Sequence, residues 1–169
     1  MFGAALEKCR EQADLVINGH EPLEADMQAL RISTDANVSR IDLVEGGRKI
    51  SDGLRAEIGC QFFDVVSLPD GNGGRIDMWL DDEGMYGVGV NPAASFVARR
   101  LAPAVQQFFF GNVVFASSDD EGETIALSDR QVHTILEALA VAACPDPEQR
   151  ADWVAVAARR FGVASPTRV

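Results

Sequence analysis

The chain has 169 residues, of which 47% are hydrophobic and 24% are charged, and its formal net charge is -11. That length suits one compact domain with an additional segment, and the hydrophobic fraction is enough to build a core. The excess of acid argues against direct nucleic-acid binding, which depends on neutralising phosphates, and favours basic partners. No apolar run approaches the roughly 18 residues that a membrane span needs, so we expect no membrane association.

Few residues of the chain have the chemistry of a metal or catalytic centre. The cysteines Cys9, Cys60 and Cys144 are far apart and form no CxxC pair or Cys/His cluster, so we expect buried thiols in a reducing cytoplasm and no zinc site. His20 and His133 lie far from any motif serine or cysteine. We therefore predict no catalytic residue, no cofactor and, on balance, no enzyme.

The N-terminal segment has the spacing of a helix. Apolar residues recur at helical intervals over residues 3–17, Gly19 ends the run, and a polar, acidic segment with Pro22 follows. We therefore interpret residues 1–20 as an N-terminal helical appendage.

From residue 27 the apolar period changes to two, which is typical of strands. The predicted strands are 27–33, 38–44, 62–68, 76–81, 85–90, 108–116 and 123–127. In the central strand, Ile76, Met78 and Leu80 share one face, and Asp77, Trp79 and Asp81 share the other. Strand neighbours face opposite sides, so only one of Phe62 and Phe63 is expected to point into the core.

Helix signals separate and follow these strands. Ser51 or Asp52 is expected to cap a helix over 51–58, and Asn91 to cap one over 91–102 that has Pro92 at its first position. Ser128 and Gln131 have the spacing of a capping box for a helix over 129–143. A C-terminal helix is expected over 147–161.

These elements predict an α+β fold. A largely antiparallel sheet of about six or seven strands should pack against the helices over residues 28–143, with the N-terminal and C-terminal helices as additions.

Several motifs of the middle region resemble one family. They are Ile58-Gly59-Cys60, Phe63-Asp64-Val65-Val66, Asp77 to Gly84, Asn91-Pro92-Ala93-Ala94 and Phe110 to Phe115. In this order the motifs, over about residues 28–130, resemble the domain of unknown function 3846, carried by phages, plasmids and their actinobacterial hosts. The resemblance implies a mobile genetic element in a bacterial cytoplasm and brings no assigned catalytic residues.

The tetrapeptide Asp-Asp-Glu-Gly occurs twice, at 81–84 and 119–122. Oxygen-rich loops suit Ca²⁺ or Mg²⁺, and Asp77 lies on the same strand face as Asp81. Neither loop has the ligand spacing of an EF-hand, and acidic turns that end in glycine are also ordinary hairpin chemistry.

The end of the central strand is the candidate binding site. The acidic turn contributes Asp81, Asp82 and Glu83, and the glycine-spaced residues 85–90 leave room for a ligand or partner. The helix start at Asn91 offers free N–H groups, or Asn91 only caps the helix.

Two further side chains have two interpretations each. Trp79, between Asp77 and Asp81, is either a platform for a base or a partner side chain, or core packing under a helix. Arg99 either binds an anion or lies on a solvated helix face. The leading functional prediction is a non-enzymatic accessory protein of a mobile element that binds a protein or small ligand. The alternatives are an acidic mimic of nucleic acid that inhibits a DNA-binding protein, or a divalent-metal enzyme acting on a nucleotide.

Overall fold

The computed structural model describes residues 27–163, so the predicted appendage over residues 1–20 lies outside the described range. One antiparallel sheet has the strand order β2-β1-β5-β4-β3, and β6 extends it beside β5. The strands are β1 (Gln28–Ile32), β2 (Val38–Asp42), β3 (Phe63–Pro69), β4 (Arg75–Asp81), β5 (Val113–Ser118) and β6 (Thr124–Ile125). The helices are α2 (Ile50–Ile58), α3 (Pro92–Leu101), α4 (Asp129–Ala143) and α5 (Pro147–Arg160), with 3₁₀ turns η1 (Glu45–Gly47) and η2 (Gly84–Tyr86). The predicted α+β class is confirmed.

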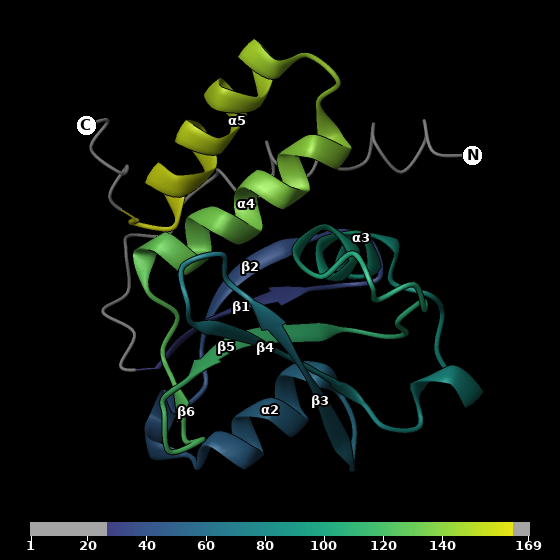
Figure 1. The fold of residues 1–169 in the computed structure, drawn as a ribbon. Helices are drawn as coiled ribbons and strands as arrows, with labels where there is room; N and C mark the ends of the chain where they lie inside the picture. Colours follow the sequence, from purple (N-terminus) through teal and green to yellow (C-terminus); the bar gives the residue numbers. More distant parts are fainter. Residues whose placement is uncertain (1–26, 164–169) are drawn as a thin grey trace.

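Helices cover both faces of the sheet. Figure 1 shows α2 on one side, α3 and α4 on the other, and α5 packed on the far side of α4. The face towards α3 and α4 carries the alternating apolar residues predicted for β4, with Ile76 and Met78 fully buried. Trp79 lies on the opposite face, in the smaller cluster under α2.

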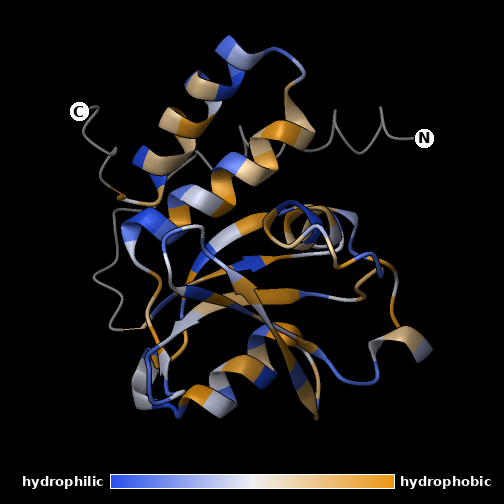
Figure 2. Cartoon of the chain, viewed as in Figure 1, coloured by the Kyte–Doolittle hydropathy of each residue, from blue (hydrophilic) through white to orange (hydrophobic). Residues whose placement is uncertain are grey.

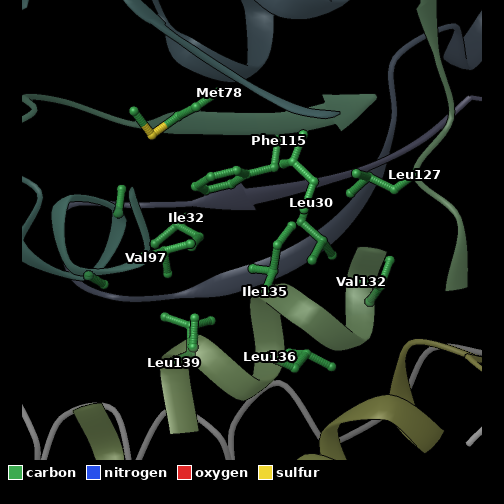
Figure 3. Close-up of a cluster of buried hydrophobic side chains, with 14 of the residues drawn as sticks. Leu30, Ile32, Met78, Val97, Phe115, Leu127, Val132, Ile135, Leu136 and Leu139 are labelled. Atoms are coloured by element: carbon green, nitrogen blue, oxygen red, sulfur yellow. The ribbon is translucent and has the colours of Figure 1, made fainter. Parts of the chain in front are cut away.

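The main core lies between the sheet and α4. Leu30 and Phe115 project from the sheet towards Ile135 and Leu139 of α4, as Figure 3 shows, and all four are buried. Each such side chain contributes about 1.5–3 kcal/mol when it leaves water. The amphipathic pattern of α4 therefore fixes which side of the helix meets the sheet.

The N-terminus of α4 is anchored by the predicted capping box. The Ser128 hydroxyl accepts the Gln131 N–H at 3.2 Å, and the Gln131 carboxamide oxygen accepts the Ser128 N–H at 3.0 Å. The amide nitrogen of Gln131 also donates to the Ser117 hydroxyl and to the Arg75 carbonyl, at 2.9 and 3.0 Å. One side chain thus caps the helix and joins it to β4 and β5.

The predicted cap of the first described helix is wrong. α2 begins at Ile50 with Lys49 at the N-cap, and no side chain caps it. A Cβ atom on Gly53 would lie 2.0 Å from the Leu43 carbonyl oxygen, so this glycine lets α2 approach the end of β2 closely. That close approach, rather than a capping side chain, positions the start of α2.

The predicted strand over residues 85–90 is also wrong. This segment begins with the η2 turn, and its sheet-like pairing is limited to a bridge between Val90 and Phe110. β5 starts only at Val113, because Gly111 adopts a φ of 75° and interrupts the extended chain before it. Residues 85–90 therefore lack a neighbouring strand to complete a ladder.

The two phenylalanines at the start of β3 differ as predicted. Phe63 packs into the cluster under α2, and its ring meets the Trp79 ring edge-on at 5.3 Å between centroids. Phe62 is 59% exposed.

Candidate functional site

The acidic turn after β4 orients its carboxylates in two ways. Asp81 is half-buried, and its carboxylate accepts the Glu83 N–H at 2.9 Å, which holds the turn. The Asp82 N–H donates to the Phe62 carbonyl at 3.1 Å, while the side chains of Asp82 and Glu83 are exposed. Two carboxylates of the turn therefore face solvent, and the third has a structural hydrogen bond.

The chain after this turn forms what we call the apolar projection, residues 84–90 together with 108–111. Figure 1 shows η2 standing away from the helical layers. The Gly111 N–H donates to the Gly89 carbonyl at 2.9 Å, which joins the two segments beside the Val90–Phe110 bridge. A Cβ atom on Gly84 would lie 3.3 Å from the Phe110 carbonyl oxygen, so glycine allows the close approach at the base.

The apolar projection exposes large hydrophobic side chains. The exposed fractions are 64% for Met85, 83% for Tyr86, 45% for Val88, 40% for Val90 and 61% for Phe108. Figure 2 shows hydrophobic colour along the segment that leads from η2 to α3. Large hydrophobic side chains that are exposed together on two bridged segments mark interaction sites more often than isolated exposed residues do.

Asn91 anchors the base of the apolar projection. Its side chain is fully buried, and its amide nitrogen donates to the carbonyls of Ile32 and Gly111, both at 2.9 Å. Its amide oxygen accepts the Ala94 N–H at 3.0 Å, as expected of an N-cap. Both amide N–H groups are therefore engaged inside the protein, and the side chain joins β1, α3 and the segment before β5.

Arg99 borders the apolar projection from the last turn of α3. Its guanidinium donates to the Gln106 carbonyl at 3.1 Å, and its Cζ lies 5.8 Å from the centre of the Phe108 ring. Cation–π contacts at exposed sites contribute about 0.5–1 kcal/mol. Arg99 thus holds the Phe108 segment against the end of α3.

Asp77 and Trp79 lie apart from this surface, on the sheet face that α2 covers. Asp77 is 5% exposed, and its carboxylate accepts the Ser67 hydroxyl at 2.5 Å. Trp79 packs against Phe63 beneath α2, which is the packing interpretation of this residue. The seven candidate residues therefore do not form one site. Asp82 and Glu83 are exposed, Asp81 holds the turn, Asn91 is a buried anchor, Arg99 lies at the end of α3, and Asp77 and Trp79 lie on the α2 side.

The second Asp-Asp-Glu-Gly turn lies at the opposite end of the sheet. Arg75, the first residue of β4, donates to the Asp119 carbonyl at 3.4 Å, whereas Asp81 ends the same strand. The Asp119 carboxylate accepts the N–H groups of Glu121 and Glu123, both at 2.9 Å. The two acidic turns therefore contribute to different surfaces, and no group of three metal-ligating side chains occurs within residues 27–163.

Cys60 is the titratable group near the acidic turn whose pKa departs from its ordinary value. Burial raises the pKa of this thiol, the charge of Asp81 raises it further, and Arg55 lowers it. Nucleophilic cysteines need a lowered pKa, because the thiolate is the reactive form. At neutral pH this thiol is protonated and therefore weakly reactive.

Sequence reasoning located the end of β4 but missed the exposed side chains beside it. Met85, Tyr86 and Phe108 were assigned to strands, where aromatic and aliphatic residues are expected to be packed. One feature of the sequence could have indicated this exposure. Val88 and Val90 alternate with glycines, which have no side chains that could cover the two valines.

Comparison with known proteins adds a family. No curated protein and no solved structure matches the chain. Within residues 27–163, no helix is long and apolar enough to cross a membrane. The family described as "Domain of unknown function (DUF3846)" matches residues 27–140, which contain the whole sheet, α2, α3 and most of α4. Because this match spans more than half of the 169 residues, the chain belongs to that family.

Proposed function

We propose that this protein is a non-enzymatic accessory protein of a phage or other mobile element, and that it acts in the cytoplasm of a bacterial host. It binds a basic protein partner through the apolar projection and the neighbouring acidic turn. The observation that carries this proposal is the joint exposure of five large hydrophobic side chains on the apolar projection.

The composition of the apolar projection supports a protein as the partner. Methionine and aromatic residues are enriched in protein interfaces, and a few such anchors supply most of the binding free energy. Tyr86 and Phe108 are aromatic anchors of this kind, and Met85 adds an adaptable apolar side chain. The bridged backbone beneath them reduces the ordering cost of binding.

Charge supports a basic partner. The net charge of -11 attracts cationic proteins over several ångströms, and Asp82 and Glu83 expose carboxylates beside the apolar projection. Complementary charge at an interface rim accelerates association and excludes acidic competitors.

Recognition by side chains is favoured over addition of a strand, because the free edge of the sheet at β3 is partly blocked. The Asp82 N–H donates to the Phe62 carbonyl, and the Asp70 N–H donates to the Gly74 carbonyl, which shows that the even-numbered residues of β3 bond to β4. The backbone N–H and C=O groups of the odd-numbered residues therefore point away from β4, towards the free edge. Those residues are Phe63, Val65, Ser67 and Pro69. The Val65 N–H donates to the Asp64 carboxylate at 2.8 Å, and Pro69 has no N–H. Both features discourage pairing with another strand.

The test is capture by the full chain from an actinobacterial host lysate, followed by affinity measurement with the purified partner. The variant Met85→Ser/Tyr86→Ser removes apolar anchors from the apolar projection. Its matched control, Ile125→Ser/Val156→Ser, removes two exposed apolar side chains elsewhere on the protein. We expect the first variant to weaken binding by at least about tenfold, since anchor residues each contribute on the order of 2 kcal/mol, and the control to bind normally.

Three results would overturn the proposal. They are an equal loss of affinity in both variants, an acidic partner, and recovery of only a second copy of the chain. A basic partner whose binding also weakens as ionic strength rises would support it, because salt screens the contribution of the acidic rim.

A further inference from the structure

A groove between α3, α4 and α5 lies on another part of the molecule and is independent of the apolar projection. Its volume is about 750 Å³, within the range of roughly 300–1,000 Å³ typical of sites for small ligands. Leu101, Val141 and Val154 supply apolar walls from the three helices. The groove is therefore large enough for a small molecule with an apolar part.

Basic side chains from two different helices line this groove. Arg100 comes from the last turn of α3 and is exposed. Arg150 comes from α5, where its guanidinium donates to the carbonyls of Cys144 and Pro145. Within the described part of the chain, neither guanidinium has a carboxylate within 4 Å.

Among the described residues, one acidic side chain also lines the groove. Glu137 is mostly exposed, and its carboxylate lies 3.7 Å from Nδ1 of His133. Among the described residues that line the groove, the two arginines and the one glutamate sum to a single positive charge. That local balance contrasts with the net charge of -11 for the whole chain.

His133 adds an unusual polar group to the groove wall. Both of its ring nitrogens are buried, and neither has a hydrogen-bond partner among residues 27–163. A buried polar group without a partner destabilises the folded protein, because it has lost its hydrogen bonds to water. A polar group bound in the groove, after a small rotation of the imidazole, would reduce that destabilisation.

We propose that this groove binds a small amphipathic carboxylate, such as a medium-chain fatty acid. The carboxylate meets Arg100 and Arg150, because guanidinium groups bind carboxylates through charge-assisted hydrogen bonds. The alkyl chain lies against Leu101, Val141 and Val154. A monoanion matches the single excess charge better than a dianionic phosphate does.

The test measures binding of octanoate to the full chain by isothermal titration calorimetry. Octanol and octyltrimethylammonium have a similar alkyl chain with no charge or with the opposite charge. We expect saturable binding of octanoate at one site. We expect the two other probes to bind more weakly by about tenfold or more, because neither has a carboxylate that accepts charge-assisted hydrogen bonds from the arginines.

Arg100→Gln and Arg99→Gln form a matched pair of variants. The two arginines are adjacent on α3, but Arg99 is turned towards Gln106 and Phe108 and does not line the groove. We expect Arg100→Gln to weaken octanoate binding by about tenfold and Arg99→Gln to leave it unchanged. Ala151→Trp, at an exposed position of the groove wall, should abolish binding by filling the space.

The proposal is overturned if octanol binds as tightly as octanoate, if the two arginine variants behave alike, or if Ala151→Trp binds normally. Unchanged circular dichroism spectra would show that each variant is folded. Octyl phosphate that binds more tightly than octanoate would also overturn the choice of a monoanion.

Discussion

The two Asp-Asp-Glu-Gly turns have the same sequence and different surroundings. In each, the first aspartate accepts a backbone N–H two residues later, and a capped helix follows after a short segment. After the turn at 119–122, the segment pairs with β5 as β6, and Leu127 is buried. After the turn at 81–84, the segment makes a bridge at Val90 and leaves its apolar side chains in solvent.

Because the same tetrapeptide is followed by such different segments, the Asp-Asp-Glu-Gly sequence alone does not identify a binding surface. A short apolar segment becomes an ordinary strand when a neighbouring strand offers its free edge, as β5 does for β6. Residues 85–90 meet the chain around Gly111 instead, where a positive φ prevents a continuous ladder. Apolar residues that remain exposed in that position are difficult to explain by folding alone, and they carry our functional proposal.

The largest expected effect on the unfolding free energy comes from changing the helix caps that follow the two turns. Asn91→Ala removes a cap and leaves the carbonyls of Ile32 and Gly111 without their amide donor, so we expect a loss of about 3 kcal/mol in unfolding free energy. Ser128→Ala removes an exposed cap and should cost about 0.5–2 kcal/mol. Urea unfolding of both variants measures the difference, and equal losses would contradict the anchoring role of Asn91.

A smaller effect is expected beside the first turn, at the start of β3. Phe63→Ala should lower the unfolding free energy by about 2–3 kcal/mol, because the ring is partly buried against Trp79. Phe62→Ala should change it by less than about 0.5 kcal/mol, since that ring is exposed. Similar losses in thermal or urea unfolding would show that the strand faces are assigned incorrectly.

The smallest effect on stability is expected from the exposed carboxylates. Asp82→Asn/Glu83→Gln and Asp120→Asn/Glu121→Gln each remove two negative charges and leave the structural aspartates Asp81 and Asp119 in place. Both double variants should unfold within about 0.5 kcal/mol of the original protein.

The same pair of variants should differ in binding. Only the first should slow association with the basic partner, by about threefold to tenfold at low salt, because its charges lie beside the apolar projection. Equal association rates of the two double variants in stopped-flow or surface-binding measurements would show that the first acidic turn does not contribute to the binding surface.

Local patterns predicted much of this structure. The alternation in β4, the cap at Asn91 and the capping box at Ser128 depend on residues close together in the sequence, so one sequence is sufficient to find them. The amide contact from Asn91 to Ile32 joins residues 59 positions apart, and Gly53 depends on the close approach of Leu43. Such contacts follow from how the elements pack, which periodicity alone does not specify.

For the same reason, the sequence located the candidate site at the end of β4 but predicted the wrong local structure for residues 85–90. Residues 85–90 have the composition of a strand, but a strand also needs a neighbour with a continuous edge. The interruption at Gly111 decides that outcome, and it becomes visible only when both segments are placed together. The exposed carboxylates of Asp82 and Glu83 were predicted, whereas the exposed rings beside them were not.

The most direct test of the central claim is site-specific photo-cross-linking in host cells at the segments that follow the two turns. The photoreactive amino acid p-benzoylphenylalanine is placed at Tyr86 in one sample and at Ile125 in another, since both side chains are exposed. Our account predicts a cross-link from position 86 to one basic protein, lost when Asp82 and Glu83 are changed to lysine, and no cross-link from position 125. Cross-links of equal yield at both positions, or at position 125 alone, would contradict it.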